Sequence, residues 1–242
     1  MLGDFVDALS VACASVLERS FYDSTQFHTL VEIPNPVPDL NHVLVVPEHD
    51  ALGVERATVV GHSMGGSVAS HFFIRHPEKT NQLVFVDGGA FQLEGEGNSS
   101  GLSNFLNVPP IRRWARHALR RFANSEDRQR QWRSAYANRL FLTEERLALR
   151  LRYQQTRDWD AAYLGVVRDG NENGLPRWIT SAEIPMTVIW GEQDRWIRIG
   201  TGRWFAGRLD APLITIDDAG HLPIEEQPEA FNAALIGVLD GE

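Results

Sequence analysis

The 242-residue chain has a single cysteine and no long apolar run. Cys13 cannot form a disulfide within the chain, which is typical of a reducing compartment, and we expect a cytoplasmic protein. No apolar run is long enough to cross a bilayer, so we expect no membrane partner. The mildly apolar stretch 8–17 follows Asp4 and Asp7, where a secretory signal would carry positive charge, and we interpret it as part of a helix.

Metal-binding patterns and phosphate-cradling loops are also missing from the sequence. The eight histidines are scattered without paired spacing, so we expect no metal and no cofactor. The formal net charge of −9 argues against nucleic acid as a partner. The length fits one domain with an insertion, enough to bury a full core.

The stretch 57–67 predicts a strand, a sharp turn and a helix in direct succession. Residues 58–60 are β-branched, residues 61–65 (GHSMG) fit the pattern G-x-S-x-G, and an apolar helical period follows. This is the context of a nucleophile elbow, which presents Ser63 at a helix N-terminus. The alternative is a glycine-rich turn that contains a serine by chance.

A serine nucleophile needs a base and an acid that orients the base, and the C-terminal part of the chain has candidates for both. Asp194 comes soon after the predicted strand 186–190. His221 comes soon after the predicted strand 213–216. Side chains beyond the carboxyl ends of parallel strands gather at one edge of the sheet. The order serine, aspartate, histidine is the one expected for α/β-hydrolases.

Four motifs carry a family resemblance: GHSMGG, LVFVDGG, IWGEQDRW and AGHLPIEEQPEAF. Over about residues 51–242 the chain resembles the α/β-hydrolase fold family, of the capped serine esterase and C–C hydrolase type. The resemblance implies an α/β fold with a mostly parallel sheet, flanking helices and a helical cap. It implies Ser63 as nucleophile, His221 as general base, Asp194 as its orienting acid and the Met64 N–H as an oxyanion donor.

Asp87 is the alternative triad acid, because it follows the predicted strand 83–86 and some hydrolases use an acid at this place. We prefer Asp194 for its GEQDRW context. We interpret His62, which precedes the nucleophile, as a packing residue rather than a base.

The first quarter of the chain matches the family poorly. Three prolines between positions 34 and 38 interrupt any regular structure, and no His-Gly pair before Gly61 offers a second oxyanion donor. We therefore expect a sheet that is shortened on the N-terminal side and an oxyanion hole that is half built. Residues 1–50 are then a rearranged or truncated start, or alternatively a divergent but functional one.

We expect a hydrolase core formed by residues 1–93 and 176–242, and a helical cap formed by 94–175. Ser125 and Thr143, each followed by acidic residues, are predicted helix N-caps. The cap should close over the serine and set substrate preference more than triad geometry.

Trp114, Trp132, Trp159 and Leu222 are candidate walls of the substrate pocket, although the aromatic residues could equally pack the cap helices onto the core. Residues 112–157 hold 13 arginines and four acidic residues, whereas the chain has one lysine, Lys79. These arginines indicate solvated helix faces or, alternatively, steering of an anionic substrate or an acidic partner surface.

The function that this sequence favours is hydrolysis of a small carboxylic ester or lactone through an acyl-enzyme. One alternative is C–C bond hydrolysis of a ring-fission diketone, which related capped enzymes perform. Another is a catalytically weak or non-catalytic homologue that lacks a complete oxyanion hole. The sequence leaves the oligomeric state open.

Overall fold

A computed structural model describes residues 55–88, 108–123, 125–155, 157–161, 163–164, 179–180 and 182–241. The expectations for residues 1–50, among them the shortened sheet and the missing second oxyanion donor, lie outside the described residues. Among the described residues, no helix is both long enough and apolar enough to span a membrane.

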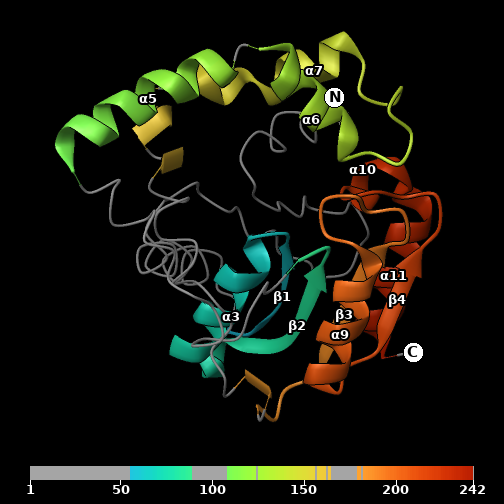
Figure 1. The fold of residues 1–242 in the computed structure, drawn as a ribbon. Coiled ribbons are helices and arrows are strands. Elements are labelled where there is room, and N and C mark those ends of the chain that lie inside the picture. Colours follow the sequence, from blue (N-terminus) through green and yellow to red (C-terminus); the bar gives the residue numbers. More distant parts are fainter. Residues whose placement is uncertain are drawn as a thin grey trace.

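The described strands form one parallel sheet in the order β1-β2-β3-β4 (Figure 1). The strands are β1 (Ala57–His62), β2 (Thr80–Val86), β3 (Met186–Gly191) and β4 (Leu213–Ile216). Each was predicted from a run of β-branched and apolar residues. The central strands β2 and β3 are almost wholly buried, as expected when helices cover both faces of a parallel sheet.

Helices cover the two faces of this sheet (Figure 1). Helices α3 (Gly65–Arg75) and α9 (Ile199–Leu209) pack on one face, where Phe72 and Phe205 join a core cluster with Phe85. Helix α11 (Pro228–Asp240) packs on the other face. Leu83 and Phe85 belong to the first cluster, whereas Val84 and Val86 belong to the second, because successive strand residues point to opposite faces. The short η1 (Pro77–Lys79) and α10 (Pro223–Glu226) complete this half of the molecule.

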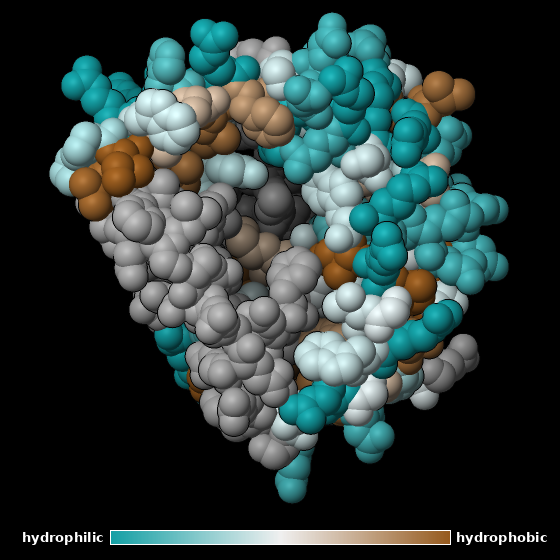
Figure 2. All heavy atoms as spheres, viewed as in Figure 1, coloured by the Kyte–Doolittle hydropathy of each residue, from teal (hydrophilic) through white to brown (hydrophobic). Residues whose placement is uncertain are grey.

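A layer of helices lies beyond the carboxyl ends of the strands (Figure 1). It contains α5 (Pro109–Ala123), α6 (Glu126–Ser134), α7 (Glu144–Arg150) and η2 (Arg152–Gln155), and we call it the helical layer. The predicted N-caps are confirmed: Ser125 and Thr143 accept hydrogen bonds from the backbone N–H groups of Arg128 and Arg146. A space-filling view shows a largely hydrophilic outer surface on this layer and a hollow below it (Figure 2).

The helical layer has its own buried contacts. Trp132, Tyr136 and Leu142 pack together, and Leu222 from the core joins their cluster. Arg116 and Arg120 both donate to the buried carboxylate of Asp160, and these ion pairs join α5 to the segment 157–161. The hydrogen bonds from the two guanidinium groups hold the pKa of the Asp160 carboxyl well below its usual range. Part of the arginine excess therefore lies in ion pairs within the layer.

Candidate active site

The turn between β1 and α3 holds Ser63 in a left-handed backbone conformation, with φ 52°. Its N–H donates to the carbonyl of Val86 at 2.8 Å, which fixes the turn against the neighbouring strand. A Cβ at Gly61 would lie 2.4 Å from the Gly65 carbonyl oxygen, and a Cβ at Gly88 would lie 2.2 Å from that of Ser63. Only glycine fits such close backbone approaches, so the sequence pattern of the elbow has a steric cause.

The structure brings Ser63, His221 and Asp194 together. His221 Nε2 lies 3.0 Å from Ser63 Oγ, and His221 Nδ1 lies 2.8 Å from Asp194 Oδ2. The histidine and the aspartate are buried, whereas Ser63 is half-buried. With the Nδ1 proton facing the carboxylate, Nε2 is free to accept a proton from the serine hydroxyl.

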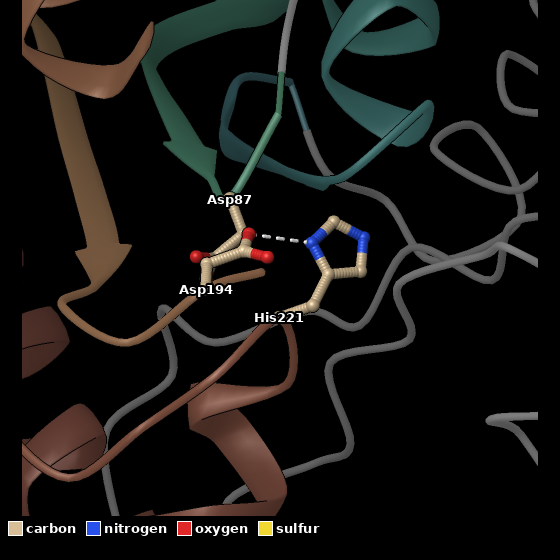
Figure 3. A group of neighbouring side chains, drawn as sticks. All are labelled: Asp87, Asp194 and His221. Atoms are coloured by element: carbon tan, nitrogen blue, oxygen red, sulfur yellow. Dashed lines mark hydrogen bonds and ion pairs between the residues drawn. The ribbon is translucent and has the colours of Figure 1, made fainter. Parts of the chain in front are cut away.

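Backbone N–H groups fix the orienting carboxylate. Asp194 Oδ1 accepts from the N–H of Trp196 at 2.7 Å and from that of Ile197 at 2.9 Å. This leaves Oδ2 for His221, as the dashed line in Figure 3 shows. Asp87 lies beside Asp194, and its own Oδ1 accepts from the Gly191 N–H at 2.8 Å. Of the two candidate acids, Asp194 is therefore the one hydrogen-bonded to the histidine.

The loop that carries His221 is held by the helical layer, which the sequence did not indicate. The His221 N–H donates to the carbonyl of Ala135 at 2.7 Å. Glu226 accepts from the N–H groups of Gly220 and Ala137, each at 2.7 Å. The two glutamates of the motif GHLPIEE were the signal for this contact in the sequence. However, Ala137, which donates to Glu226, lies about ninety residues away along the chain.

His62 also helps to hold His221. Its role therefore goes beyond the packing role that we expected from the sequence. His62 Nε2 lies 2.6 Å from the backbone carbonyl oxygen of His221, and the two rings are 5.0 Å apart. Burial, with the neighbouring His221 ring, lowers the pKa of His62 to about 3. His62 is therefore neutral at physiological pH and donates its Nε2 proton to that carbonyl.

The four candidate pocket residues take different places. Trp132 and Leu222 are buried in one cluster. The centroid of the Trp196 ring lies 5.4 Å from that of Trp132 and 5.1 Å from that of His221. Trp159 is half-buried in the short segment 159–161. Trp114 is 71% exposed on α5, as expected for a residue on a solvated helix face. Trp196 was not among the predicted wall residues, although it lies in the GEQDRW motif.

A buried ion pair joins the helical layer to α10. The Arg150 guanidinium bonds the Glu225 carboxylate and donates to the Tyr136 hydroxyl, which itself donates to Glu225 at 3.0 Å. Burial and the adjacent Glu225 charge raise the pKa of Tyr136 well above its usual range. These contacts with Arg150 and Tyr136 hold α10, the segment that follows His221, against the helical layer.

Three buried groups of the kind that bind metals also meet here. One carboxylate oxygen each from Asp87 and Asp194 and one ring nitrogen of His221 lie within 4.8 Å of one another. No spacing pattern in the sequence predicted this group, because the three residues are far apart along the chain. The 2.8 Å contact between Nδ1 and Asp194, with Ser63 Oγ at Nε2, has the arrangement of a catalytic triad.

Comparison with known families supports the fold described above. The Alpha/beta hydrolase family matches residues 17–234. The chain belongs to the alpha/beta hydrolase family. The match begins nearer the N-terminus than the four motifs indicated, so the family likeness includes much of the first quarter that the motifs had left out.

Among curated relatives, a 2-hydroxy-6-oxononadienedioate/2-hydroxy-6-oxononatrienedioate hydrolase from Paraburkholderia phymatum is 28% identical over 205 residues, covering 83% of this chain and 68% of the relative. A solved alpha/beta hydrolase from a Medee basin deep-sea metagenome library aligns with a TM-score of 0.62 at 18% identity, covering 89% of this chain and 76% of that one. A meta-cleavage product hydrolase from Pseudomonas fluorescens IP01 aligns with a TM-score of 0.60 at 16% identity, covering 93% and 75%. The structural likenesses establish the fold, and the family match establishes a hydrolase.

Proposed function

We propose that this hydrolase cleaves a small carboxylic ester or lactone through Ser63. The observation that carries the proposal is the continuous hydrogen-bonded row from Ser63 Oγ through His221 to Asp194. A serine hydroxyl is a weak nucleophile, and an adjacent oriented imidazole is the usual means of activating it.

In the proposed reaction, Ser63 Oγ attacks the substrate carbonyl while His221 Nε2 takes its proton. Asp194 keeps the ring in the required tautomer and stabilises the imidazolium. The Met64 N–H, at the start of α3, donates to the developing oxyanion, where the helix dipole favours negative charge. His221 then protonates the leaving alcohol, and a water that it activates releases the acid from the acyl-enzyme.

A second candidate is hydrolysis of a carbon–carbon bond in a ring-fission diketone. The curated relatives named 2-hydroxy-6-oxononadienedioate/2-hydroxy-6-oxononatrienedioate hydrolase favour it. Both reactions add water across a bond to a carbonyl carbon, so the same serine and histidine can serve each. They differ in the leaving group, which is an alkoxide oxygen in one case and a stabilised carbanion in the other.

The helical layer, within the interval 94–175, supports a cap role in this proposal. Its outer surface is largely hydrophilic, and its inner residues reach Leu222 and the His221 loop. A cap in this position excludes water and shapes the pocket above Ser63.

The test measures turnover of short-chain nitrophenyl esters and of a 2-hydroxy-6-oxo-dienedioate by the wild-type protein and by the Ser63→Ala variant. We expect ester turnover in the wild type that Ser63→Ala abolishes, and a fluorophosphonate adduct on the peptide that contains Ser63. Faster turnover of the dienedioate than of any ester would favour the second candidate. Wild type that neither turns over these substrates nor takes up the fluorophosphonate would contradict the proposal.

A further inference from the structure

Asp87 is a fully buried carboxyl group that the proposed reaction does not use. It follows β2 directly, its N–H donates to the carbonyl of Ile189 at 3.0 Å, and its backbone is left-handed with φ 44°. Asp is one of the few residues besides Gly that tolerates this conformation. From there the side chain extends to the Asp194 carboxylate (Figure 3).

The two neighbouring carboxyl groups have unequal sets of hydrogen-bond donors. Asp194 accepts three hydrogen bonds, from the N–H groups of Trp196 and Ile197 and from His221 Nδ1. Asp87 accepts one, from Gly191 to Oδ1, and among the described residues its buried Oδ2 has no donor. Donors stabilise the charged form of a carboxyl group, so the negative charge belongs on Asp194.

Two adjacent buried carboxylates cannot both be charged without a large electrostatic cost. The charged groups that face Asp87 are Asp194 after β3, His221 after β4 when protonated, and Glu226 on α10. Burial, together with the charge on Asp194, raises the pKa of Asp87 well above its ordinary value. A proton on Oδ2 removes this repulsion and supplies the donor that the orphaned oxygen needs.

We propose that Asp87 is a positioning residue: a neutral carboxylic acid that donates its Oδ2 proton to Asp194 and holds that carboxylate in line with His221. The assignment differs from the alternative in which Asp87 itself orients the histidine. It rests on the proposed function only for its effect on turnover, because the protonation state is a property of the resting protein.

The direct test is infrared spectroscopy of the full chain with ¹³C-labelled aspartate carboxyl groups at neutral pH. We expect a protonated-carboxyl C=O band that shifts with the label, persists in Asp217→Asn and disappears in Asp87→Asn. The label separates this band from any signal of Glu226, whose pKa burial also raises. Absence of a label-sensitive band in the wild type, or its persistence in Asp87→Asn, would overturn the assignment whether or not the enzyme turns over an ester.

A kinetic test separates positioning from simple packing. Asp87→Asn keeps a neutral donor, so kcat should stay within about threefold of wild type, whereas Asp87→Ala removes the donor and should lower kcat about tenfold with KM unchanged. Wild-type kcat should decline at alkaline pH as Asp87 ionises beside Asp194, and Asp87→Asn should lack this decline. Equal losses in both variants, or an unchanged alkaline decline in Asp87→Asn, would contradict a proton-donating role. If Asp87→Ala does not fold, the Asp87→Asn pH profile still decides.

Discussion

His221 donates its backbone N–H to the carbonyl of Ala135 at 2.7 Å, so the helical layer directly holds the loop that carries the proposed base. Arg195, next to the proposed acid, donates to the carbonyl of Tyr136 at 2.8 Å. Both loops of the triad therefore rest on the segment that follows α6. These contacts make the layer part of the framework that holds the proposed acid and base, in addition to the cap role proposed for it.

Replacing Asp194 tests the triad. Asp194→Asn keeps the side-chain shape but removes the charge that orients the imidazole and stabilises its protonated form. We expect kcat for a nitrophenyl ester to fall by about 10⁴-fold, as for the corresponding change in a serine protease, with a native circular dichroism spectrum. Asp217→Asn, at an exposed carboxylate after β4, is the matched control and should leave kcat unchanged. A loss of less than about tenfold would argue against Asp194 as the orienting acid.

Glu226 tests the link between the helical layer and the histidine loop. The Glu226 carboxylate accepts from backbone N–H groups that include those of Gly220 and Ala137. In Glu226→Gln, an amide NH₂ replaces one carboxylate oxygen and faces at least one of these N–H groups. Leaving one such donor unpaired should cost about 1–3 kcal/mol in the free energy of unfolding, measured with urea. Activity should fall at the same time, because His221 follows Gly220. Glu229→Gln, exposed on α11, should change neither quantity.

Acid titration tests His62. Above about pH 6.5 the ring is neutral in both the folded and the unfolded chain, and its contribution to stability is fully present. As the pH falls toward 3, only the unfolded chain takes up the proton, so the free energy of unfolding decreases, by an amount on the order of 4 kcal/mol. His62→Gln should flatten this part of the stability curve, whereas the exposed His117→Gln should not. Parallel curves for wild type and His62→Gln would contradict the buried neutral histidine.

The buried pair Arg150 and Glu225 tests how the layer is fastened. Arg150→Met leaves the Glu225 charge buried and unpaired, and should reduce the free energy of unfolding by about 3–5 kcal/mol. Arg150→Met combined with Glu225→Gln should recover much of this loss. Arg130→Met, in an exposed ion pair on α6, should cost no more than about 1 kcal/mol. A double variant as unstable as Arg150→Met would indicate that packing around Arg150, rather than the unpaired charge, causes the loss.

Local sequence determined the elements that position the site. The four described strands, the elbow at Ser63 and the caps at Ser125 and Thr143 were predicted because β-branched runs, close-packed glycines and short polar side chains act on their immediate neighbours. The order of Ser63, Asp194 and His221, with their positions after strand ends, also predicted that they would meet.

Contacts between distant segments determine which groups meet within that site. Asp87 and Asp194 both follow strand ends, and only the donors around each carboxyl show which one bonds His221. The contact of Ala135 with His221 joins residues 86 positions apart, and no local pattern encodes a pairing at that distance. Trp114 was chosen as an aromatic in the predicted cap, but its exposure depends on which helix face meets the core. A sequence specifies which chemical groups are available at a sheet edge. The packing of distant segments specifies which hydrogen-bond donors each group meets, which group carries the charge and which groups are exposed to solvent.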